Sequence, residues 1–268
     1  MDKRYKLIIG VVSILMLFSA CAGSHDTEAC HDTMYQVSTL MSLMSGNFDG
    51  FLSVGEFKQM GDFGMGTFEK IDGEMIMLDG TVYQARGDGE VAVAADTVGL
   101  PFAVTTHFDC DMTLDIKGCS SLQELTERLN RIVDERGRNM IYAVSIQTGM
   151  CDSLTFRSEV AHEKPYRPLA EAMTYSQRTF GCRDTGGTVV AVYFPDFFNL
   201  QNLVGWHFHF LSEDCRKGGH LLDIISHDNM HVQLDVTPFY HLYMPDSKDF
   251  NDTDHNMGTV SEIEAVEK

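Results

Sequence analysis

The chain has 268 residues, of which 44% are hydrophobic and 22% are charged, and its formal net charge is −19. This length allows one large domain or two small ones, and the hydrophobic content excludes a wholly disordered chain. The negative charge argues against nucleic-acid binding, because proteins that bind phosphate backbones present cationic surfaces. We interpret it as a solvated acidic surface.

The first 21 residues have the pattern of a bacterial export signal. A basic start (residues 3–6) precedes an almost wholly apolar run (residues 7–17), and a segment ending in Ser19-Ala20-Cys21 follows. This order is typical of a secretory signal peptide, and the apolar run is short for a transmembrane helix. The ending resembles a lipoprotein box, although Phe18 stands where leucine is more usual. We therefore expect export with a lipid anchor on Cys21, with plain secretion or an uncleaved anchor as alternatives.

Export would place the remaining cysteines where disulfides can form. The seven cysteines of the chain are Cys21, Cys30, Cys110, Cys119, Cys151, Cys182 and Cys215. If Cys21 carries lipid, an even number remains. Cys110 and Cys119 could pair, but free or buried thiols fit the spacing equally well. No CxxC motif is present, so the cysteines give little support for a zinc or redox site.

The N-terminal half has the pattern of a strand-rich region. Frequent glycines between residues 46 and 73 indicate a turn-dense sheet. Asp79-Gly80 supports a two-residue hairpin turn, because these residues tolerate the positive φ angles that such a turn requires. The predicted segments are a tether over 22–33, a short helix over 38–45, hairpin strands over 74–78 and 81–85, and a strand over 102–108.

The strongest helix signal covers residues 121–136. Ser121 and Glu124 have the spacing of a capping box, in which each side chain bonds a backbone N–H at the helix start. The apolar positions recur at helical spacing and form one stripe: Leu122, Leu125, Leu129, Ile132 and Val133. Gly137 follows, and glycine is favoured where a helix ends in the left-handed conformation. We therefore predict a helix that begins after Ser121 and ends at Gly137.

The C-terminal half is again mostly strands. We predict a weaker helix over 168–179 and strands over 140–146, 188–194, 204–211, 220–226 and 231–236. Strand-rich halves with few helices predict an α+β fold with mixed or antiparallel sheets, and not a regular βαβ series. We place an N-terminal sheet domain at 34–140 and a C-terminal, metal-binding sheet domain with a closing tail at 141–268.

Three histidines lie within one short window of the C-terminal half. If residues 206–211 form a strand, His207 and His209 point to the same face with Cα atoms about 6.5 Å apart. A polar turn that ends in two glycines can then place His220 on a neighbouring strand beside them. Three neutral imidazoles leave a divalent ion positively charged and coordinatively open, which suits catalysis. The pattern therefore predicts a catalytic metal centre with these three ligands.

Two other interpretations of this window are open from the residues alone. The histidines could be partly exposed side chains between aromatic residues, without a metal. His207, His209 and Glu213 also have the spacing of the first metal-binding motif of cupin-like oxygenases, although the later motif of that family is missing. His227 and His231 form a second pair, but a polar break between them favours a surface turn.

Long stretches of the chain resemble the α-acetolactate decarboxylase family. The matching stretches are YQVSTLMSLMSGNFDG (35–50), GDFGMGTFEKIDGEMIMLDGTVYQ (61–84), FRSEVAHEKPY (156–166), GWHFHFLSEDCRKGGHLLD (205–223) and EIEAVE (262–267). They are spread over nearly all of the chain after the export signal, and the stretch with the three histidines is highly specific. The chain departs from the family at Phe48, where tyrosine is frequent, and at Cys215, but neither residue is a proposed ligand.

The resemblance implies a fold, a metal and a set of site residues. The fold would be two mixed-sheet domains with a cleft between them, in a homodimer. The zinc ligands would be His207, His209 and His220, in agreement with the spacing argument. The other active-site residues carry over to Thr67, Glu74, Arg157 and a C-terminal glutamate that closes onto the zinc region, Glu264 or alternatively Glu267.

The resemblance also implies a reaction, the decarboxylation of 2-acetolactate to acetoin and CO2. Zinc at the ketone and hydroxyl oxygens would act as the electron sink, so that no organic cofactor is needed. Arg157 would hold the substrate carboxylate through its planar set of donors. Glu74 would protonate the new carbanion with support from Glu264, and Thr67 would orient the substrate. The non-enzymatic alternative is a lipoprotein that sequesters zinc and needs neither Glu74 nor Arg157.

Overall fold

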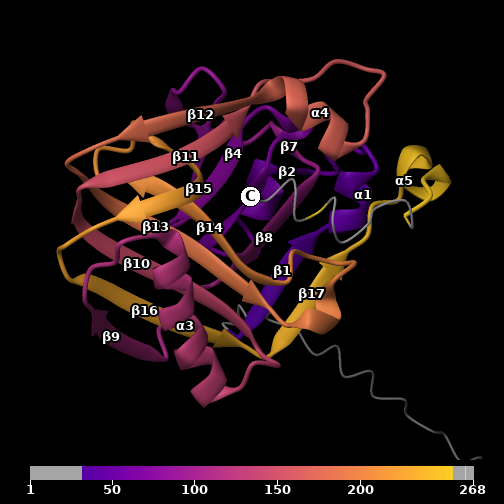
Figure 1. Cartoon of the computed structure of the whole chain (residues 1–268). Helices are drawn as coiled ribbons and strands as arrows, with labels where there is room; N and C mark the ends of the chain where they lie inside the picture. Colours follow the sequence, from indigo (N-terminus) through magenta and orange to yellow (C-terminus); the bar gives the residue numbers. More distant parts are fainter. Residues whose placement is uncertain (1–31, 256–262, 264–268) are drawn as a thin grey trace, which may run out of the picture.

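Two large β-sheets pack face to face in the computed structural model, which describes residues 32–255 and Ile263 (Figure 1). The first sheet has the strand order β17-β1-β8-β3-β4-β5-β6. Its strands are β1 (Thr33–Val37), β3 (Phe63–Thr67), β4 (Glu74–Leu78), β5 (Thr81–Ala85), β6 (Val91–Val93), β8 (Phe102–Thr106) and β17 (Phe239–Tyr243). The β1–β17 pair is parallel and the other pairs are antiparallel, so this sheet is mixed.

The second sheet is antiparallel throughout and has the strand order β12-β11-β15-β14-β13-β10-β16-β9. Its strands are β9 (Met112–Ile116), β10 (Ile141–Cys151), β11 (Ser153–Glu159), β12 (Gln177–Cys182), β13 (Thr185–Phe194), β14 (Gly205–Ser212), β15 (Gly218–Ile225) and β16 (Met230–Thr237). A small separate sheet pairs β2 (Leu52–Ser53) with β7 (Gly99–Leu100). The predicted α+β class with mixed and antiparallel sheets is confirmed.

The helices are mostly short and lie around the sheets (Figure 1). They are α1 (Leu40–Met44), α2 (Val54–Phe57), α3 (Leu122–Arg136), α4 (Leu169–Ser176) and α5 (Lys248–Asp252), with 3-10 turns η1 (Glu69–Ile71) and η2 (Asp196–Phe198). Helix α3 covers the outer face of the second sheet, and α2 covers that of the first. Helices α1 and α4 pack against each other at one end of the two sheets.

The core is therefore built in layers. Side chains of both sheets meet in a shared cluster that includes Met65 and Ile76 from the first sheet and Val190 and Leu211 from the second. Because both faces of the first sheet are covered, every residue of β4 from Glu74 to Met77 is buried. Buried and exposed residues therefore do not alternate along this strand. Strand β4 packs against the second sheet, and the candidate site lies at this contact.

Helix α3 confirms the strongest helix prediction. Ser121 is its N-cap and accepts a hydrogen bond from the backbone N–H of Glu124. The Glu124 carboxylate accepts a hydrogen bond from the backbone N–H of Ser120, the residue before the N-cap. In a standard capping box it would accept from the N-cap itself, so this half of the motif is shifted by one residue. Leu125 and Leu129 are fully buried against the second sheet, and each contributes about 2 kcal/mol relative to an exposed side chain.

The other local predictions differ mainly in their ends. The hairpin of β4 and β5 is confirmed, with positive φ angles at Asp79 and Gly80. The helix predicted over 168–179 ends at Ser176, because residues from Gln177 onward pair with β11 as strand β12. The predicted strands after residue 140 are all present, and most are longer than predicted.

The two sheets exchange strands across the predicted domain boundary at 140/141. Strand β9 and helix α3 come from the N-terminal half and lie with the second sheet. Strand β17 comes from the C-terminal half and pairs with β1 of the first sheet. The division into two domains stays a prediction, but the exchanged strands tie the halves together.

The export signal over 1–21, the lipid site at Cys21 and most of the tether over 22–33 lie outside the described residues and stay predictions. Among the helices that are described, none is both long enough and apolar enough to cross a membrane. The described cysteines are free thiols, so Cys110 and Cys119 are not paired.

Asp235 on β16 is a fully buried carboxyl group close to other acids. One of its oxygens accepts the backbone N–H of Asp109 at 3.2 Å, and the other has no hydrogen-bond partner. Burial, together with repulsion from Asp111, Asp109 and Asp32, raises the pKa of Asp235 to about 7. The folded protein therefore holds a proton here that the unfolded chain releases near pH 4.

We predict that the Asp235→Asn variant has a flatter dependence of stability on pH. Between about pH 4 and pH 7 the wild-type unfolding free energy should fall by about 1.4 kcal/mol per pH unit from this group, because only the folded state retains the proton. Urea unfolding at several pH values measures this difference. Parallel curves for the wild type and the variant would contradict it, and the exposed Asp246→Asn is the control.

Candidate metal centre and active site

The three predicted histidine ligands lie together on β14 and β15. His207 and His209 are two residues apart on β14 and share a face, and His220 pairs directly with His209 across the β14–β15 ladder. Their ring centroids are 4.8–5.6 Å apart. One nitrogen of each ring lies within 4.8 Å of the others, and this is the only group of metal-ligating side chains of this kind among the described residues. The arrangement can hold one metal ion.

Two glycines before His220 allow its strand to approach both neighbours. A Cβ atom on Gly218 would lie 2.6 Å from the carbonyl oxygen of Phe210 on β14. A Cβ atom on Gly219 would lie 2.3 Å from the carbonyl oxygen of Arg157 on β11, and Gly219 has a φ of +148°. Any larger residue would push β15 away, so the glycines set the distance from His220 to His209.

His207 and His209 are held in the neutral state that a metal ligand requires. Burial, with a smaller contribution from the positive charge of Arg157, lowers the pKa of His207 to about 3. Burial also lowers the pKa of His209, with a smaller contribution from His207. His209 Nδ1 donates to the carbonyl oxygen of Met75 on β4 at 2.8 Å, because a carbonyl can only accept. This bond leaves Nε2 of His209 unprotonated and directed toward the site, as in many metal centres.

Charged residues from both sheets surround the histidines. Glu74, the first residue of β4, places Oε2 3.4 Å from His209 Nε2. Arg157 on β11 donates from Nη1 to Glu74 Oε1 at 2.8 Å and to Glu159 Oε1 at 2.5 Å. All three charged side chains are almost fully buried, and buried charges of this kind require paired partners.

Thr67 completes the polar part of the site. It lies on β3 directly opposite Glu74 in the β3–β4 ladder. Its hydroxyl donates to the carbonyl oxygen of Gly73 at 2.9 Å, which leaves the lone pairs of the oxygen available as acceptors.

Five of the predicted site residues line one cavity between the sheets. Its polar wall consists of Thr67, Glu74, Arg157, Glu159, His207 and His220. Its apolar wall comes largely from α1 and α4, through Leu40, Leu43, Leu169 and Met173. Glu159 was missed by sequence reasoning. The available signal was its position two residues after Arg157, which places both side chains on one face of a strand.

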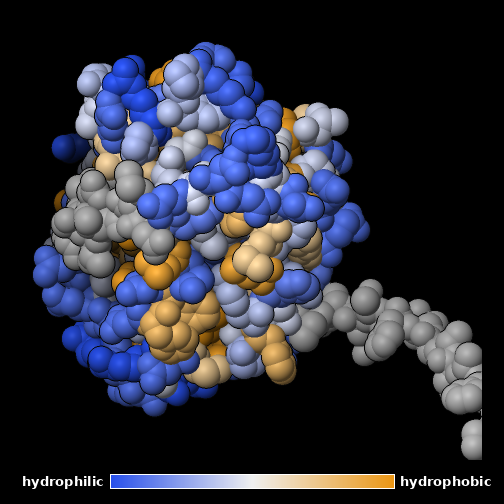
Figure 2. Space-filling view, turned by 90° about the vertical axis from the view of Figure 1, so that its right-hand side faces the viewer, coloured by the Kyte–Doolittle hydropathy of each residue, from blue (hydrophilic) through white to orange (hydrophobic). Residues whose placement is uncertain are grey.

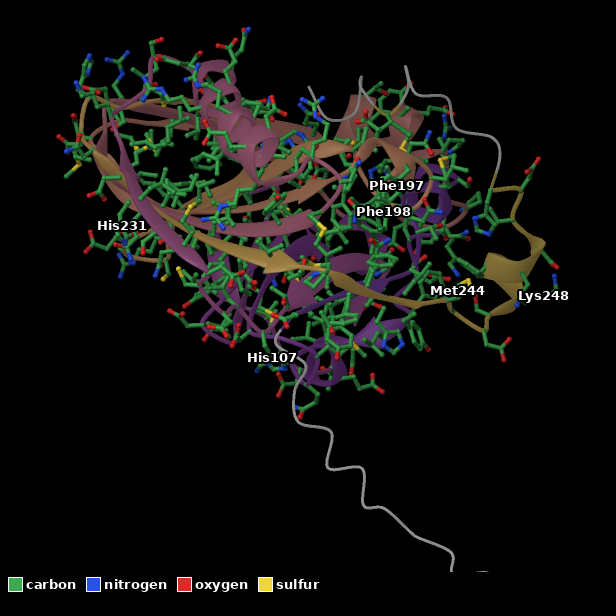
Figure 3. All side chains as sticks on the ribbon, turned by 90° about the horizontal axis from the view of Figure 1, so that it is seen from below. His107, Phe197, Phe198, His231, Met244 and Lys248 are labelled. Atoms are coloured by element: carbon green, nitrogen blue, oxygen red, sulfur yellow. The ribbon has the colours of Figure 1, made fainter. Side chains whose placement is uncertain are left out.

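Several other predictions involve the C-terminal segment and the second histidine pair. Glu264 and Glu267 lie outside the described residues, so their role stays a prediction. Ile263 packs into the cluster formed by α1 and α4, which also borders the cavity. His227 and His231 are surface residues, as predicted, and Figure 3 shows His231 at the outer edge of the molecule.

Glu213 does not belong to the group that can hold a metal among the described residues. The ligand set of a cupin-like oxygenase is therefore not formed.

A sequence profile of the alpha-acetolactate decarboxylase family matches residues 34–257. The chain belongs to this family. The alpha-acetolactate decarboxylase of Methanosarcina mazei is 35% identical over 237 residues, which cover 88% of this chain and 81% of that protein. The enzyme of Bacillus licheniformis is also 35% identical, over 88% of this chain and 92% of its own length.

A solved structure agrees with this assignment. The crystal structure of alpha-acetolactate decarboxylase from Bacillus subtilis strain 168 matches with a TM-score of 0.83 at 32% sequence identity. The match covers 88% of this chain and 99% of that chain. The resemblance read from the sequence is confirmed at the level of family and fold.

We predict that His207→Ala abolishes specific metal binding. Removing one of three imidazoles leaves two protein ligands, too few for a tight divalent site, so bound metal should fall well below about one ion per chain. Inductively coupled plasma mass spectrometry on the dialysed protein measures it. His231→Ala is the matched control, because this exposed histidine bonds only Asp115 in the described contacts. Full metal content in His207→Ala would contradict the ligand assignment.

Proposed function

We propose that the protein is a zinc-dependent enzyme that decarboxylates 2-acetolactate to acetoin and CO2. The single observation that carries the proposal is the cavity in which three convergent imidazoles adjoin Arg157 and Glu74. Family membership supports the same activity, since the relatives are named alpha-acetolactate decarboxylases.

The donor set fits a zinc ion. His207, His209 and His220 supply neutral nitrogens, and zinc accepts three such ligands and keeps a position open for a substrate. The Nε2 atom of His209 is buried and makes no hydrogen bond, which is the state expected of a ligand atom. A zinc ion held there would supply a Lewis acid that stabilises negative charge on the substrate oxygens.

The protein side chains bind and orient the substrate. 2-Acetolactate carries a carboxylate, a hydroxyl on the same carbon and an adjacent ketone. Arg157, whose guanidinium lines the cavity, can bind the carboxylate and later the charge that develops on the ketone oxygen. The Thr67 oxygen can accept a hydrogen bond from the substrate hydroxyl. Apolar residues of α1 and α4 cover the cavity and keep water from the reacting carbon.

The reaction needs one proton at a defined carbon. When the bond to the carboxylate breaks, its electron pair moves toward the ketone and forms an enediolate, and CO2 leaves. The carbon that carried the carboxylate must then take a proton to give acetoin. Glu74 lies between Arg157 and His209, so its carboxyl group, once it has taken a proton from solvent, is placed to deliver that proton inside the cavity.

We predict that Glu74→Gln keeps its zinc but loses turnover. Glutamine has nearly the same shape but cannot donate the proton, and general acid catalysis contributes about 100- to 10,000-fold to a rate. Acetoin formation from 2-acetolactate, with zinc quantified in the same sample, measures both effects. The wild type should turn over, stop when zinc is chelated and recover when zinc is returned.

Two outcomes would argue against this proposal. Near-normal turnover in Glu74→Gln would remove the proton-donor role. A wild type that binds zinc tightly but forms no acetoin would support the zinc-sequestering lipoprotein instead.

We also propose a homodimer, as the family resemblance implies. Strand β17 is the outer strand of the first sheet, and Figure 2 shows apolar side chains gathered on the face that carries it. The large apolar side chains exposed along β17, η2 and the residues beside them are Phe197, Leu200, Phe239, Tyr243 and Met244. Phe197 and Met244 are both labelled in Figure 3.

Sedimentation of the wild type should give the mass of two chains. The Phe239→Asp and Met244→Asp double variant should shift the protein toward one chain, because buried carboxylates without partners oppose association. A wild type that sediments as a monomer at micromolar concentration would contradict the dimer.

A further inference from the structure

Glu159 is a second buried carboxylate on the guanidinium of Arg157. Its Oε1 atom accepts from Arg157 Nη1 at 2.5 Å, while the same nitrogen donates to Glu74 at 2.8 Å. The side chain of Glu159 is 2% exposed and lines the same cavity as the histidines. Neither the metal-ligand pattern nor the reaction proposed above requires this residue.

Glu159 is a second carboxylate beside the ion pair of Arg157 and Glu74. Glu159 adds one further negative charge to a nearly inaccessible region, and burying a charge is costly unless strong partners compensate it. Its partner is the Nη1 atom of Arg157 that also binds Glu74, so one guanidinium nitrogen is shared by a carboxylate of β11 and a carboxylate of β4.

The backbone around Glu159 is held on both sides. On β11, Glu159 pairs with Gln177 of β12, and Arg157 pairs with His220 of β15. Between them, the Ser158 hydroxyl donates to the carbonyl oxygen of Ala85 on β5 at 2.5 Å, which ties β11 to the first sheet. The carboxylate of Glu159 is therefore a fixed point relative to both the histidines and Glu74.

We propose that Glu159 is a positioning residue, which fixes the guanidinium of Arg157 between the two sheets by sharing its Nη1 atom with Glu74. This inference rests on the proposed decarboxylase function. With Glu159 present, Arg157 Nη1 is shared, and the second oxygen of Glu74 stays 3.4 Å from His209 Nε2. Without Glu159, Nη1 of Arg157 loses one of its two carboxylate partners, and the guanidinium and Glu74 shift together from their working positions.

The role predicts a loss in kcat with little change in KM. Arg157 keeps its charge and its place in the cavity wall, so the substrate carboxylate can still pair with it and KM changes little. The alignment of the guanidinium and of Glu74 with the reacting carbon is lost, and a displacement of about 1 Å can cost on the order of 100-fold in rate.

The experiment compares Glu159→Gln, Glu159→Asp and Glu163→Gln with the wild type, each loaded with zinc. Glu163 is an exposed neighbour on the same segment, paired with Lys70, and its variant removes the same charge at the surface. We expect Glu159→Gln to keep its zinc and its thermal unfolding midpoint within a few degrees, and to lose about 10- to 100-fold in kcat with KM within about threefold. Glu159→Asp should recover part of the loss, and Glu163→Gln should match the wild type.

A kcat within twofold of the wild type in Glu159→Gln would overturn the proposal. A loss of kcat in Glu159→Gln that parallels a loss of zinc or of thermal stability, and that is equally large in Glu159→Asp, would also overturn it. A purely structural role gives that result. Crystal structures of the zinc-loaded wild type and Glu159→Gln supply a readout that needs no turnover. The guanidinium of Arg157 should leave its wild-type position in the variant, and an unmoved guanidinium would contradict the positioning role. If the wild type itself forms no acetoin, the proposed function fails, and this structural comparison still decides the role of Glu159.

Discussion

The site depends on the contact between the two sheets. Strand β4 of the first sheet lies against β14 and β15 of the second. Two of the interactions between the sheets hold the site together. One is the hydrogen bond from His209 to the carbonyl oxygen of Met75, and the other is the ion pair of Arg157 with Glu74. The first fixes the ring of a metal ligand, and the second brings a carboxylate to that ligand. A shift of one sheet against the other would separate the metal ligands from the acid and would leave buried charges without partners.

The local elements and the histidine cluster could be read from the sequence because their signals are local. Helix α3 follows from a cap, an apolar stripe and a terminal glycine. His207 and His209 share a face because alternate residues of a strand do so, and the two glycines before His220 mark a close approach of backbones. The roles expected of Glu74, Thr67 and Arg157 came from the family resemblance, since nothing local distinguishes a buried acid on β4 from an ordinary strand residue. The structure brings all of them to one cavity, while their catalytic roles stay predictions.

The features that the sequence did not predict are long-range. The pairing of β1 with β17 joins residues about two hundred positions apart, and β9 joins the opposite sheet by pairing with β16. Such pairings depend on which hydrophobic faces meet, and a local pattern does not specify the partner. The end of α4 was predicted too late for the same reason, because β11 recruits the following residues as strand β12. Glu159 was overlooked because its importance comes from Arg157 and Glu74, which meet only in the folded protein.

We propose that three imidazoles share one divalent ion at the junction of the sheets, beside Glu74 and Arg157. The most direct test is a crystal structure of the zinc-loaded protein with anomalous diffraction measured at the zinc absorption edge. The account predicts one strong peak per chain, within bonding distance of one nitrogen each from His207, His209 and His220, about 2.0–2.1 Å for zinc. A zinc-loaded crystal with no peak at these three rings, or with its zinc bound elsewhere, would contradict it.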